Sequence, residues 1–487
     1  MQIPFENRYV TLGEGFFDRT SPTPVKKPEL IEFNYALASE LGIATDQASA
    51  LAADVFSGNR LPEGAEPLAM AYAGHQFAHF VPQLGDGRAL LLGEVTGLDG
   101  ARYDIHLKGT GRTFFSRNGD GRSALGPVLR EYLVSEAMNV LKVPTTRALA
   151  AVTTGEPVAR ERLLPGGVIT RVASSFVRVG TFQYFAARED YDAVRLLADY
   201  VIEKNYPQLA DSKNPYVAFL QAVMERQAAL IAQWMQSGFI HGVMNTDNMS
   251  IAGETIDYGP CAFMDAYDHD QVFSSIDRQG RYAYSNQPSI GLWNLTRLAE
   301  TLLPLFDEDP QAAVNAAQQV LQGYAESYAS HWLAGMQAKC GLTACRHIKN
   351  QEDKALVEDL LDLMDESHAD FSLTFYHLSR LADQPSEQDK NLHALFADHA
   401  RVDDWLTRWR QRLRLEAQSN QARQEAMQAV NPVYIPRNHQ IEAAIRAAED
   451  QGDFSVFHEL HAVLQNPYLQ QEGKEKYMQA PEPEEVV

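Results

Sequence analysis

The sequence contains only three cysteines in 487 residues, Cys261, Cys340 and Cys345. Three thiols are too few for a disulfide framework, so we expect a hydrophobic core, and not crosslinks, to hold the fold. The first residues, MQIPFENRYV, lack the basic and then apolar layout of a secretion signal. These two absences predict a protein of the reducing cytoplasm.

Basic residues and long apolar runs are also scarce. Lysine and arginine number 42 against 64 aspartates and glutamates, which gives a formal net charge of -22. Such a surface repels nucleic acid and anionic membranes. Even LAMAYAGHQFAHFV is interrupted by Gly, Gln and His, and no apolar run reaches the ~20 residues that cross a bilayer. We therefore expect neither nucleic acid nor membrane as a partner, and any anionic ligand requires a local basic pocket.

The chain is long enough for two or three packed units, and its 45% hydrophobic content is that of a globular protein. Residues 28–56 have the pattern of one or two helices. Short apolar or alternating runs separated by GDG and GLDG predict an antiparallel meander with strands at 80–84, 88–95 and 102–108. A helix over 124–141 and strands at 147–153 and 167–172 complete a small sheet with one helix.

Beyond about residue 185 the chain is predicted to be mostly helical. The clearest helix covers 215–237, because Asn214 can cap it, Pro215 suits its first turn and Gly238 can end it. The other expected helices lie at 189–204, 292–306, 310–339, 353–366, 401–429 and 453–465. A sheet-containing first part and a helical second part indicate an α+β protein.

The stretch HGVMNTDNMSIAGETIDYGP, residues 241–260, is unusually rich in oxygen ligands. Gly253-Glu254 is typical of a two-residue hairpin turn, which would set Asp257 opposite Ser250 and one diagonal step from Asn248. Amide and carboxylate oxygens that converge in this way suit a hard cation such as Mg²⁺. Taken alone, an Asn- and Asp-rich segment is more often a simple turn.

The spacing within this stretch matches that of a protein-kinase catalytic loop. Asn248 follows His241 at the kinase interval, and Asp257-Tyr258-Gly259 stands where kinases have Asp-Phe-Gly. The position of the kinase base is occupied by Val243, which cannot accept a proton. Asp247, beside the predicted metal ligand, is the available substitute.

The first half of the chain offers candidates for phosphate binding. GDGRA, residues 85–89, combines glycines with Arg88, although a plain hairpin turn is the simpler interpretation. Lys108 ends a predicted strand, on the face that Asp104 and His106 share. In kinases such a lysine pairs with a helix glutamate, and here Glu131 and Glu136 both qualify by type. They lie five residues apart, so only one is expected to face the site, and periodicity does not favour Glu131.

Several blocks together resemble one family. AYAGHQF, PQLGDGRA, HLKGTGRT, FSRNGDGRSALGPVLREYL, ITRVASS, VRVGTFQYFA, HGVMNTDNMSIAGETIDYGP and VNPVYIPRNH are similar to blocks of the selenoprotein O family, also called YdiU. The resemblance covers about 71–439 and implies a protein-kinase-like bilobal fold with a small antiparallel-sheet N-lobe and a larger, mostly helical C-lobe. The expected units are an N-terminal helical extension at 1–60, the N-lobe at 61–185, the C-lobe at 186–400, and a C-terminal helical extension with an acidic tail at 401–487.

The resemblance also implies an activity, protein adenylyltransfer. ATP would bind in reversed orientation with Mg²⁺ or Mn²⁺, and AMP would pass to Ser, Thr or Tyr hydroxyls of proteins, the protein itself included. Asp247 would be the general base, while Lys108 would bind phosphate and pair with Glu131. The implied metal ligands are Asn248 and Asp257. The other implied nucleotide-binding residues are Gly85, Gly87, Arg88, Asp120, Gly121, Arg171 and Arg178.

Other interpretations share the fold or compete with it. Transfer of UMP from UTP, a conventional kinase that transfers the γ-phosphoryl group, and an inactive ATP-binding scaffold all fit a kinase-like cleft. His75 and His79 are spaced like a helical zinc-protease pair, but Gln76 replaces the essential glutamate. Cys340, Cys345 and His347 fit no standard metal pattern. No cysteine follows Cys345, so a thiol switch in the tail, as in some family members, is not expected.

Overall fold

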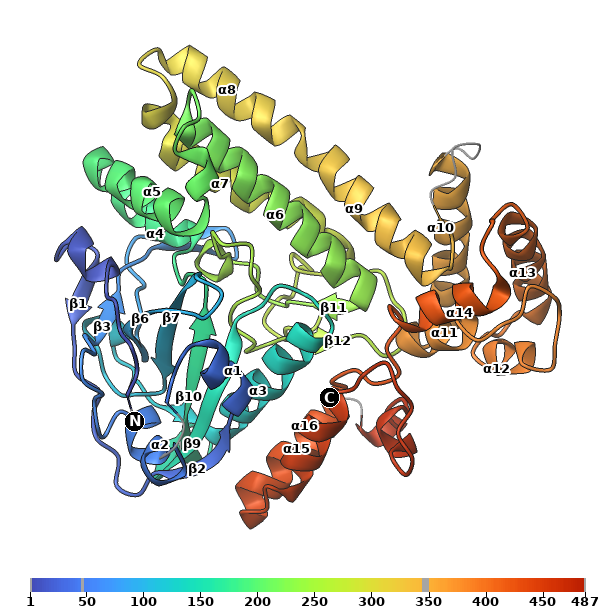
Figure 1. Cartoon of the computed structure of the whole chain (residues 1–487), viewed down its shortest axis with the longest axis horizontal. Helices are drawn as coiled ribbons and strands as arrows, with labels where there is room; N and C mark the ends of the chain where they lie inside the picture. The colour runs from blue at the N-terminus through green and yellow to red at the C-terminus, as the bar shows by residue number, and fades with distance from the viewer. Residues whose placement is uncertain (1, 45–47, 344–349, 486–487) are drawn as a thin grey trace.

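The computed structural model describes residues 2–44, 48–343 and 350–485. An antiparallel sheet forms much of the N-terminal part, and helices dominate the C-terminal part (Figure 1). The predicted α+β class is confirmed. None of the helices within the described residues is both long and apolar enough to span a bilayer.

The main sheet places its strands in an order that differs from their order in the sequence. From edge to edge the strands are β1 (Phe17–Arg19), β3 (Leu68–Met70), β6 (Ala89–Thr96), β7 (Arg102–Lys108), β10 (Leu163–Ala173), β9 (Arg147–Ala159) and β2 (Glu29–Phe33), with β8 (Ser123–Ala124) beside β10. Neighbouring strands pair antiparallel. The strands expected near 88–95, 102–108, 147–153 and 167–172 are confirmed as β6, β7, β9 and β10.

Two predictions for the sheet were wrong. The strand expected at 80–84 does not join the meander, because β5 (His79–Val81) pairs with β4 (Gly74–Gln76) in a separate hairpin. The segment 28–56 is not purely helical, because β2 precedes α1 (Tyr35–Glu40) and α2 (Ala48–Phe56). Ile31 and Phe33 of β2 are buried at a two-residue interval, so the first 60 residues contribute both edge strands of the sheet.

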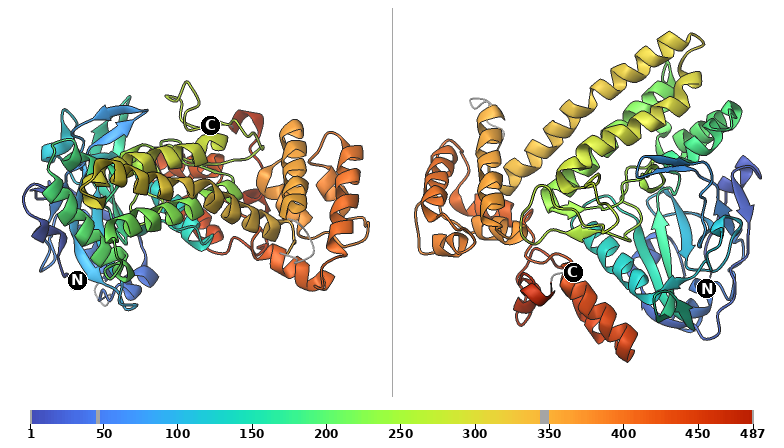
Figure 2. Two further views of the ribbon diagram at one scale, coloured as in Figure 1. Left: turned by 90° about the horizontal axis from the view of Figure 1, so that it is seen from above. Right: turned by 180° about the vertical axis from the view of Figure 1, so that it is seen from behind.

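A helix, α3 (Leu125–Val140), covers one face of the sheet, and the end of the chain covers α3 in turn. Helices α15 (Asn438–Gln451) and α16 (Ser455–Leu464) share a hydrophobic cluster with it. The rings of Tyr132 and Phe457 lie 5.7 Å apart in this cluster. Figures 1 and 2 show the red C-terminal helices beside the N-terminal lobe, far in sequence from the elements they cover.

A buried ion network joins the sheet to α5 (Tyr191–Asn205), next to α4 (Val179–Ala186). The Lys204 side chain has no exposed surface, and its Nζ lies 2.9 Å from Glu94 Oε1 and also bonds Asp104. The other oxygen of Glu94 accepts from the backbone N–H of Tyr9 at 2.5 Å. One lysine therefore holds strands β6 and β7 and the N-terminal segment to the helical part.

The helical part is centred on α6 (Pro215–Ser237). As predicted, Asn214 Oδ1 accepts from the backbone N–H of Val217 at 3.2 Å, and Gly238 ends the helix at φ 68°. Helices α7 (Gln287–Phe306), α8 (Pro310–Gln322) and α9 (Tyr324–Lys339) run beside it (Figure 1). The prediction of a single helix over 310–339 was wrong, because α8 ends at Gln322 and α9 begins at Tyr324, on either side of Gly323.

The distal helices pack around a separate apolar cluster. They are α10 (Asn350–Ser367), α11 (Phe371–Leu378), α12 (Asp389–His393), α13 (His399–Leu413) and α14 (Asn420–Gln428), and the short strands β11 (Phe239–Ile240) and β12 (Ala262–Phe263) lead toward them. The stripe of Trp405 and Trp409 is core, as expected, with the rings stacked 6.0 Å apart. The helix expected over 401–429 is divided, because Ser419 caps a new helix.

Candidate active site

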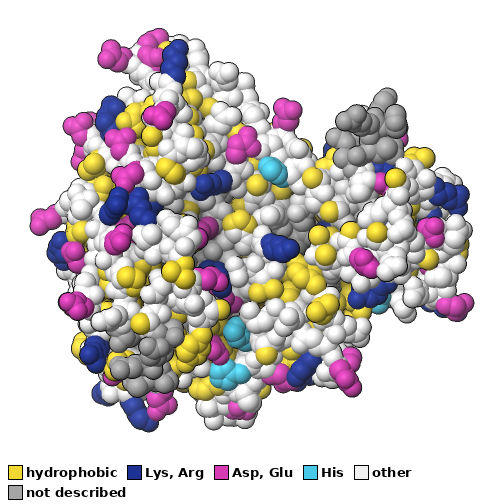
Figure 3. All heavy atoms as spheres, viewed as in Figure 1, with side chains coloured by type: hydrophobic (Ala, Val, Ile, Leu, Met, Phe, Trp, Pro, Cys, Tyr) yellow, Lys and Arg dark blue, Asp and Glu magenta, His cyan; other side chains and the backbone are white. Residues whose placement is uncertain are grey.

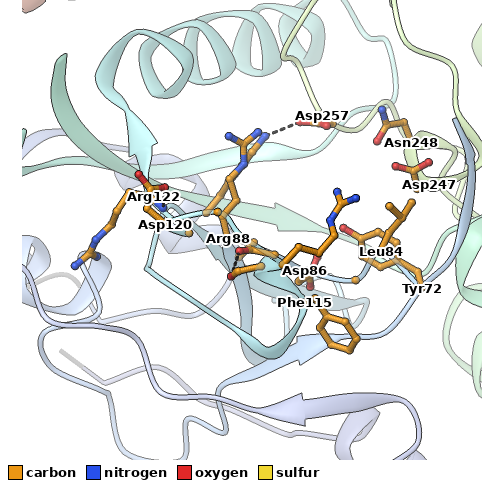
Figure 4. A pocket seen from close by; sticks show the side chains of 18 of the residues that line it. Tyr72, Leu84, Asp86, Arg88, Phe115, Asp120, Arg122, Asp247, Asn248 and Asp257 are labelled. Carbon is orange, nitrogen blue, oxygen red and sulfur yellow. Dashed lines mark hydrogen bonds and ion pairs between the residues drawn. The ribbon is translucent and has the colours of Figure 1, made fainter. Parts of the chain in front are cut away.

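A cavity of about 610 Å³ lies between the sheet and the helical part, and its lining gathers residues far apart in the sequence (Figure 4). All the predicted nucleotide, base and metal residues line it except Glu131, which lies behind Lys108. The predicted lining residues are Gly85, Gly87, Arg88, Lys108, Asp120, Gly121, Arg171, Arg178, Asp247, Asn248 and Asp257. The kinase-like spacing and the phosphate candidates thus meet at one place.

Lys108, at the end of β7, is the centre of an ion network. Its Nζ lies 2.7 Å from Glu131 Oε2 and 2.5 Å from Asp257 Oδ1. The second oxygen of Glu131 accepts from Arg171 Nη1 at 3.2 Å. Glu136, the alternative, accepts two hydrogen bonds from Arg147 instead. The structure therefore selects Glu131, which helix periodicity alone did not favour.

Two buried groups below this network were missed in the sequence. His106 Nε2 lies 3.1 Å from Asp86 Oδ2, and its Nδ1 lies 3.0 Å from Arg171 Nη2. Burial lowers the pKa of His106 to about 4, so the neutral ring can donate to Asp86 and accept from Arg171. Asp86 lies in the GDG motif, where the sequence indicated only the two glycines and Arg88. No local pattern indicated its partner His106, 20 residues away.

Arg171 and Arg178 supply buried positive charge to the cavity. The Arg178 guanidinium lies 4.1 Å from the centre of the Tyr72 ring, and its Nε donates to the Phe176 carbonyl at 3.1 Å. Arg171 lies 5.0 Å from the centre of the Phe176 ring. Both side chains are buried, so stacking and backbone contacts hold the two cations in fixed positions.

Asp247 lies in a short helical turn, Thr246–Asn248, with one carboxylate oxygen held and the other free. Its Oδ2 accepts from Gln76 Nε2 at 3.2 Å, whereas Oδ1 is buried and has no hydrogen-bond partner among the described residues. Burial raises the pKa of Asp247 to about 6. A Cβ at Gly74 would lie 2.4 Å from Oδ1, so only glycine lets the β4–β5 hairpin approach this carboxylate.

The hairpin predicted within 250–257 does not form. Ser250 bridges Arg178, and Thr255 bridges Thr145 of the N-terminal part. Gly253, at φ 76°, closes a tight turn through its N–H to the Ser250 carbonyl at 3.3 Å. Distant partners took the place of the local strand pairing, so Asp257 is not set opposite Ser250.

Asp257 and Asn248 offer an oxygen-only donor set. Although burial opposes its charge, Lys108 and Arg171 hold the pKa of Asp257 well below its usual range, so the carboxylate stays ionised. Asn248 Nδ2 donates to the Val243 carbonyl at 3.1 Å, which leaves the amide oxygen available. A carboxylate and an amide oxygen beside a phosphate-binding cavity fit Mg²⁺ or Mn²⁺.

The far end of the cavity is formed by a polar loop. Asp120 and Arg122 lie at the opposite end from Asp247 and Asn248 (Figure 4). Arg160 holds the Asp120 carboxylate at 2.8 Å, and Gly121 adopts φ 68° where a Cβ would collide with the Gly111 carbonyl. Asp120 is therefore engaged by protein groups and shapes the loop.

The competing metal interpretations find no support in the described residues. His75 and His79 lie on the paired strands β4 and β5, not on a helix, and His75 Nδ1 lies 2.8 Å from Gln183 Nε2. Cys340 is buried in an apolar cluster, while Cys345 and His347 lie outside the described residues.

Comparison with known proteins identifies the family. A family model described as "Protein adenylyltransferase SelO" matches residues 1–465. The chain belongs to the SelO family. It is 58% identical over 485 residues to the "Protein nucleotidyltransferase YdiU" of Rhizobium johnstonii, which covers 100% of this chain and 96% of the relative. A YdiU protein of Rhodopseudomonas palustris is 58% identical over 488 residues, 100% and 98% of the two chains. The kinase-like SelO architecture and a nucleotidyltransferase activity follow from this membership.

Proposed function

We propose that this SelO member transfers AMP from ATP to Ser, Thr or Tyr hydroxyls of cytoplasmic proteins, with a divalent metal ion and with ATP in reversed orientation. One observation carries the proposal: the carboxylate of Asp247, which has one oxygen without a hydrogen-bond partner among the described residues, lines the same cavity as the buried Arg171 and Arg178. A base for a hydroxyl and cations for a leaving group thus flank one nucleotide-sized space.

The reversed orientation is inferred from where the positive charge lies. Arg171, Arg178 and Lys108 are buried, whereas Arg88 is exposed. The buried cations would attract the most negative part of ATP, its β- and γ-phosphates. The α-phosphate would then lie toward the acceptor hydroxyl, in keeping with transfer of AMP.

The reaction uses the chain's residues in distinct roles. The Asp247 carboxylate takes the proton of the acceptor hydroxyl, whose oxygen forms a bond to the α-phosphorus. The bond between the α-phosphorus and the bridging oxygen breaks, and pyrophosphate leaves with its charge held by Lys108, Arg171 and Arg178. A divalent ion, when bound by Asn248 and Asp257, would neutralise phosphate charge.

The test uses ATP labelled at the α- or the γ-phosphate, with Mg²⁺ or Mn²⁺ and total cell protein as acceptor. We expect α-label on protein with the wild type, and loss of label with Asp247→Asn, with Asp257→Asn, or after chelation. Asp211→Asn, at an exposed aspartate outside the cavity, is the matched control and should keep activity. Label only from the γ-position would establish a kinase, and bound ATP without label would establish a scaffold. UTP labelled at the α-phosphate, used in place of ATP, tests transfer of UMP.

A further inference from the structure

A surface of aromatic and arginine side chains lies next to Asp247, on the side of the β4–β5 hairpin. We define it by His75, Phe80, Arg281, Trp293 and Arg297. The His75 ring lies 4.9 Å from Phe80 and 5.2 Å from Trp293. Arg281 and Arg297 lie 4.7 and 5.0 Å from the centre of the Trp293 ring. This aromatic–arginine surface joins the hairpin to α7 and to the segment before it.

The hairpin is tied to the catalytic loop by three successive residues. The backbone N–H of His75 donates to Thr246 Oγ1 at 2.7 Å, and that of Phe77 donates to Asn245 Oδ1 at 3.1 Å. Between them, Gln76 donates to the Asp247 carboxylate. His75 of the aromatic–arginine surface is thus the chain neighbour of Gln76, which contacts the proposed base. A molecule bound to this surface would therefore lie close to Asp247.

The charge of this surface is opposite to that of the protein as a whole. The chain carries a net charge of -22, and Figure 3 shows acidic and basic side chains interspersed over one face. The Arg281 side chain forms no ion pair with any carboxylate of the described residues, whereas Arg297 pairs with Glu300 at 2.7 Å. Phe80 is 40% exposed. Exposed aromatic rings beside an arginine that has no carboxylate partner are typical of the residues that contribute most to protein–protein binding.

We propose that the aromatic–arginine surface docks the acceptor, and that it prefers a protein segment with acidic residues beside the hydroxyl to be modified. This inference rests on the proposed function, because it assumes a protein hydroxyl at Asp247. Arg281 would pair with an acidic side chain, while Phe80 and Trp293 would bury apolar parts of the segment. Single-stranded nucleic acid also stacks on aromatic rings, but the net charge of the protein disfavours it.

The test uses a pair of synthetic peptides that share a central threonine and differ in their flanking residues, glutamate in one and lysine in the other. Transfer of α-label from ATP is measured with wild type, Arg281→Glu and Arg195→Glu. Arg195 is the matched control, because this residue of α5 lies 5.5 Å from the centre of the Tyr216 ring of α6 and does not line the cavity. We expect wild type to prefer the glutamate peptide, and Arg281→Glu to raise KM for it about tenfold with little change in kcat. Arg195→Glu should behave as wild type.

The outcomes separate the two proposals. Equal labelling of both peptides, preference for the lysine peptide, or an unchanged KM in Arg281→Glu overturns the docking surface. A wild type that labels itself but neither peptide also overturns it. Loss of oligo(dT) binding in Arg281→Glu, with peptide labelling unchanged, assigns the surface to nucleic acid instead. A wild type that transfers no α-label to any protein, itself included, overturns the proposed function.

Discussion

Replacement of Asp247 by asparagine should abolish transfer and yet stabilise the protein. The carboxylate is buried, its Oδ1 has no hydrogen-bond partner among the described residues, and its pKa is raised to about 6. The folded state therefore binds a proton more tightly at this position than the unfolded state does. In the window between the ordinary pKa of 3.8 and about 6, stability falls as pH rises, and above it the whole penalty is present.

The size of the effect follows from the shift. A rise of the pKa from 3.8 to about 6 corresponds to ~3 kcal/mol of lost stability at pH 8. Asparagine removes this penalty and can still accept the hydrogen bond from Gln76. Its new amide group would be buried without an acceptor, which costs about 1 kcal/mol. The expected net gain for Asp247→Asn is therefore about 2 kcal/mol at pH 8, and below 1 kcal/mol at about pH 5.

Denaturant unfolding followed by circular dichroism, at both pH values and with chelator present, measures this difference. Asp257→Asn is the matched control, for which we expect a change in the free energy of unfolding of the opposite sign. The pKa of Asp257 is depressed by Lys108, so its contribution to stability is present above the unfolded pKa, and its removal should destabilise the protein at pH 8. An Asp247→Asn protein that is less stable than wild type at pH 8, or that gains equally at both pH values, would refute the reasoning.

Three further predictions follow from side-chain contacts. Gln76→Leu removes the hydrogen bond that favours ionised Asp247, so the acid limb of kcat/KM against pH, expected near pH 6, should move up by about 0.5–1 unit. Glu131→Gln removes the charge that positions Lys108 and Arg171, so AMP transfer at saturating ATP should fall by about 10²-fold. Lys204→Met leaves two buried carboxylates without a cation, and denaturant unfolding should show a loss of ~3–5 kcal/mol.

Each of these has a control in the same region or of the same kind. Gln83→Leu alters an exposed glutamine close to the hairpin and should leave the pH profile unchanged. Glu136→Gln breaks a buried ion pair with Arg147, on the same helix as Glu131. It should lower the free energy of unfolding and leave kcat close to that of the wild type. Lys354→Met breaks an exposed pair with Glu358 and should change stability by less than about 0.5 kcal/mol. Equal effects in a variant and its control would contradict the assigned contact.

The secondary structure was predictable where one local signal was strong. Asn214, Pro215 and Gly238 defined α6 at both ends because capping depends on neighbouring residues only. The short strand β2 was missed, since a helical pattern over a longer window concealed the alternation of Ile31 and Phe33. The unit boundaries at 60, 185 and 400 stay predictions.

The site was predictable in its residue types and less so in its contacts. The spacing of Asn248 and Asp257 marked the catalytic loop, and the family resemblance selected Glu131. The contact between Gln76 and Asp247 joins residues 171 positions apart, and no local pattern encodes such a distance. The hairpin predicted at Gly253-Glu254 failed for the same reason, because Thr145 and Arg178 offered better partners from elsewhere in the chain.

The packing of α15 and α16 on α3 has a consequence for synthesis. The helix that carries Glu131 leaves the ribosome more than 300 residues before its covering helices do. Until residues 438–464 emerge, the apolar side of α3, including Tyr132, has no partner from that end of the chain. A nascent chain or a fragment that stops before α15 therefore exposes apolar side chains of α3, which chaperones can bind. The lobe that holds Lys108 is fully packed only after α15 and α16 have been synthesised.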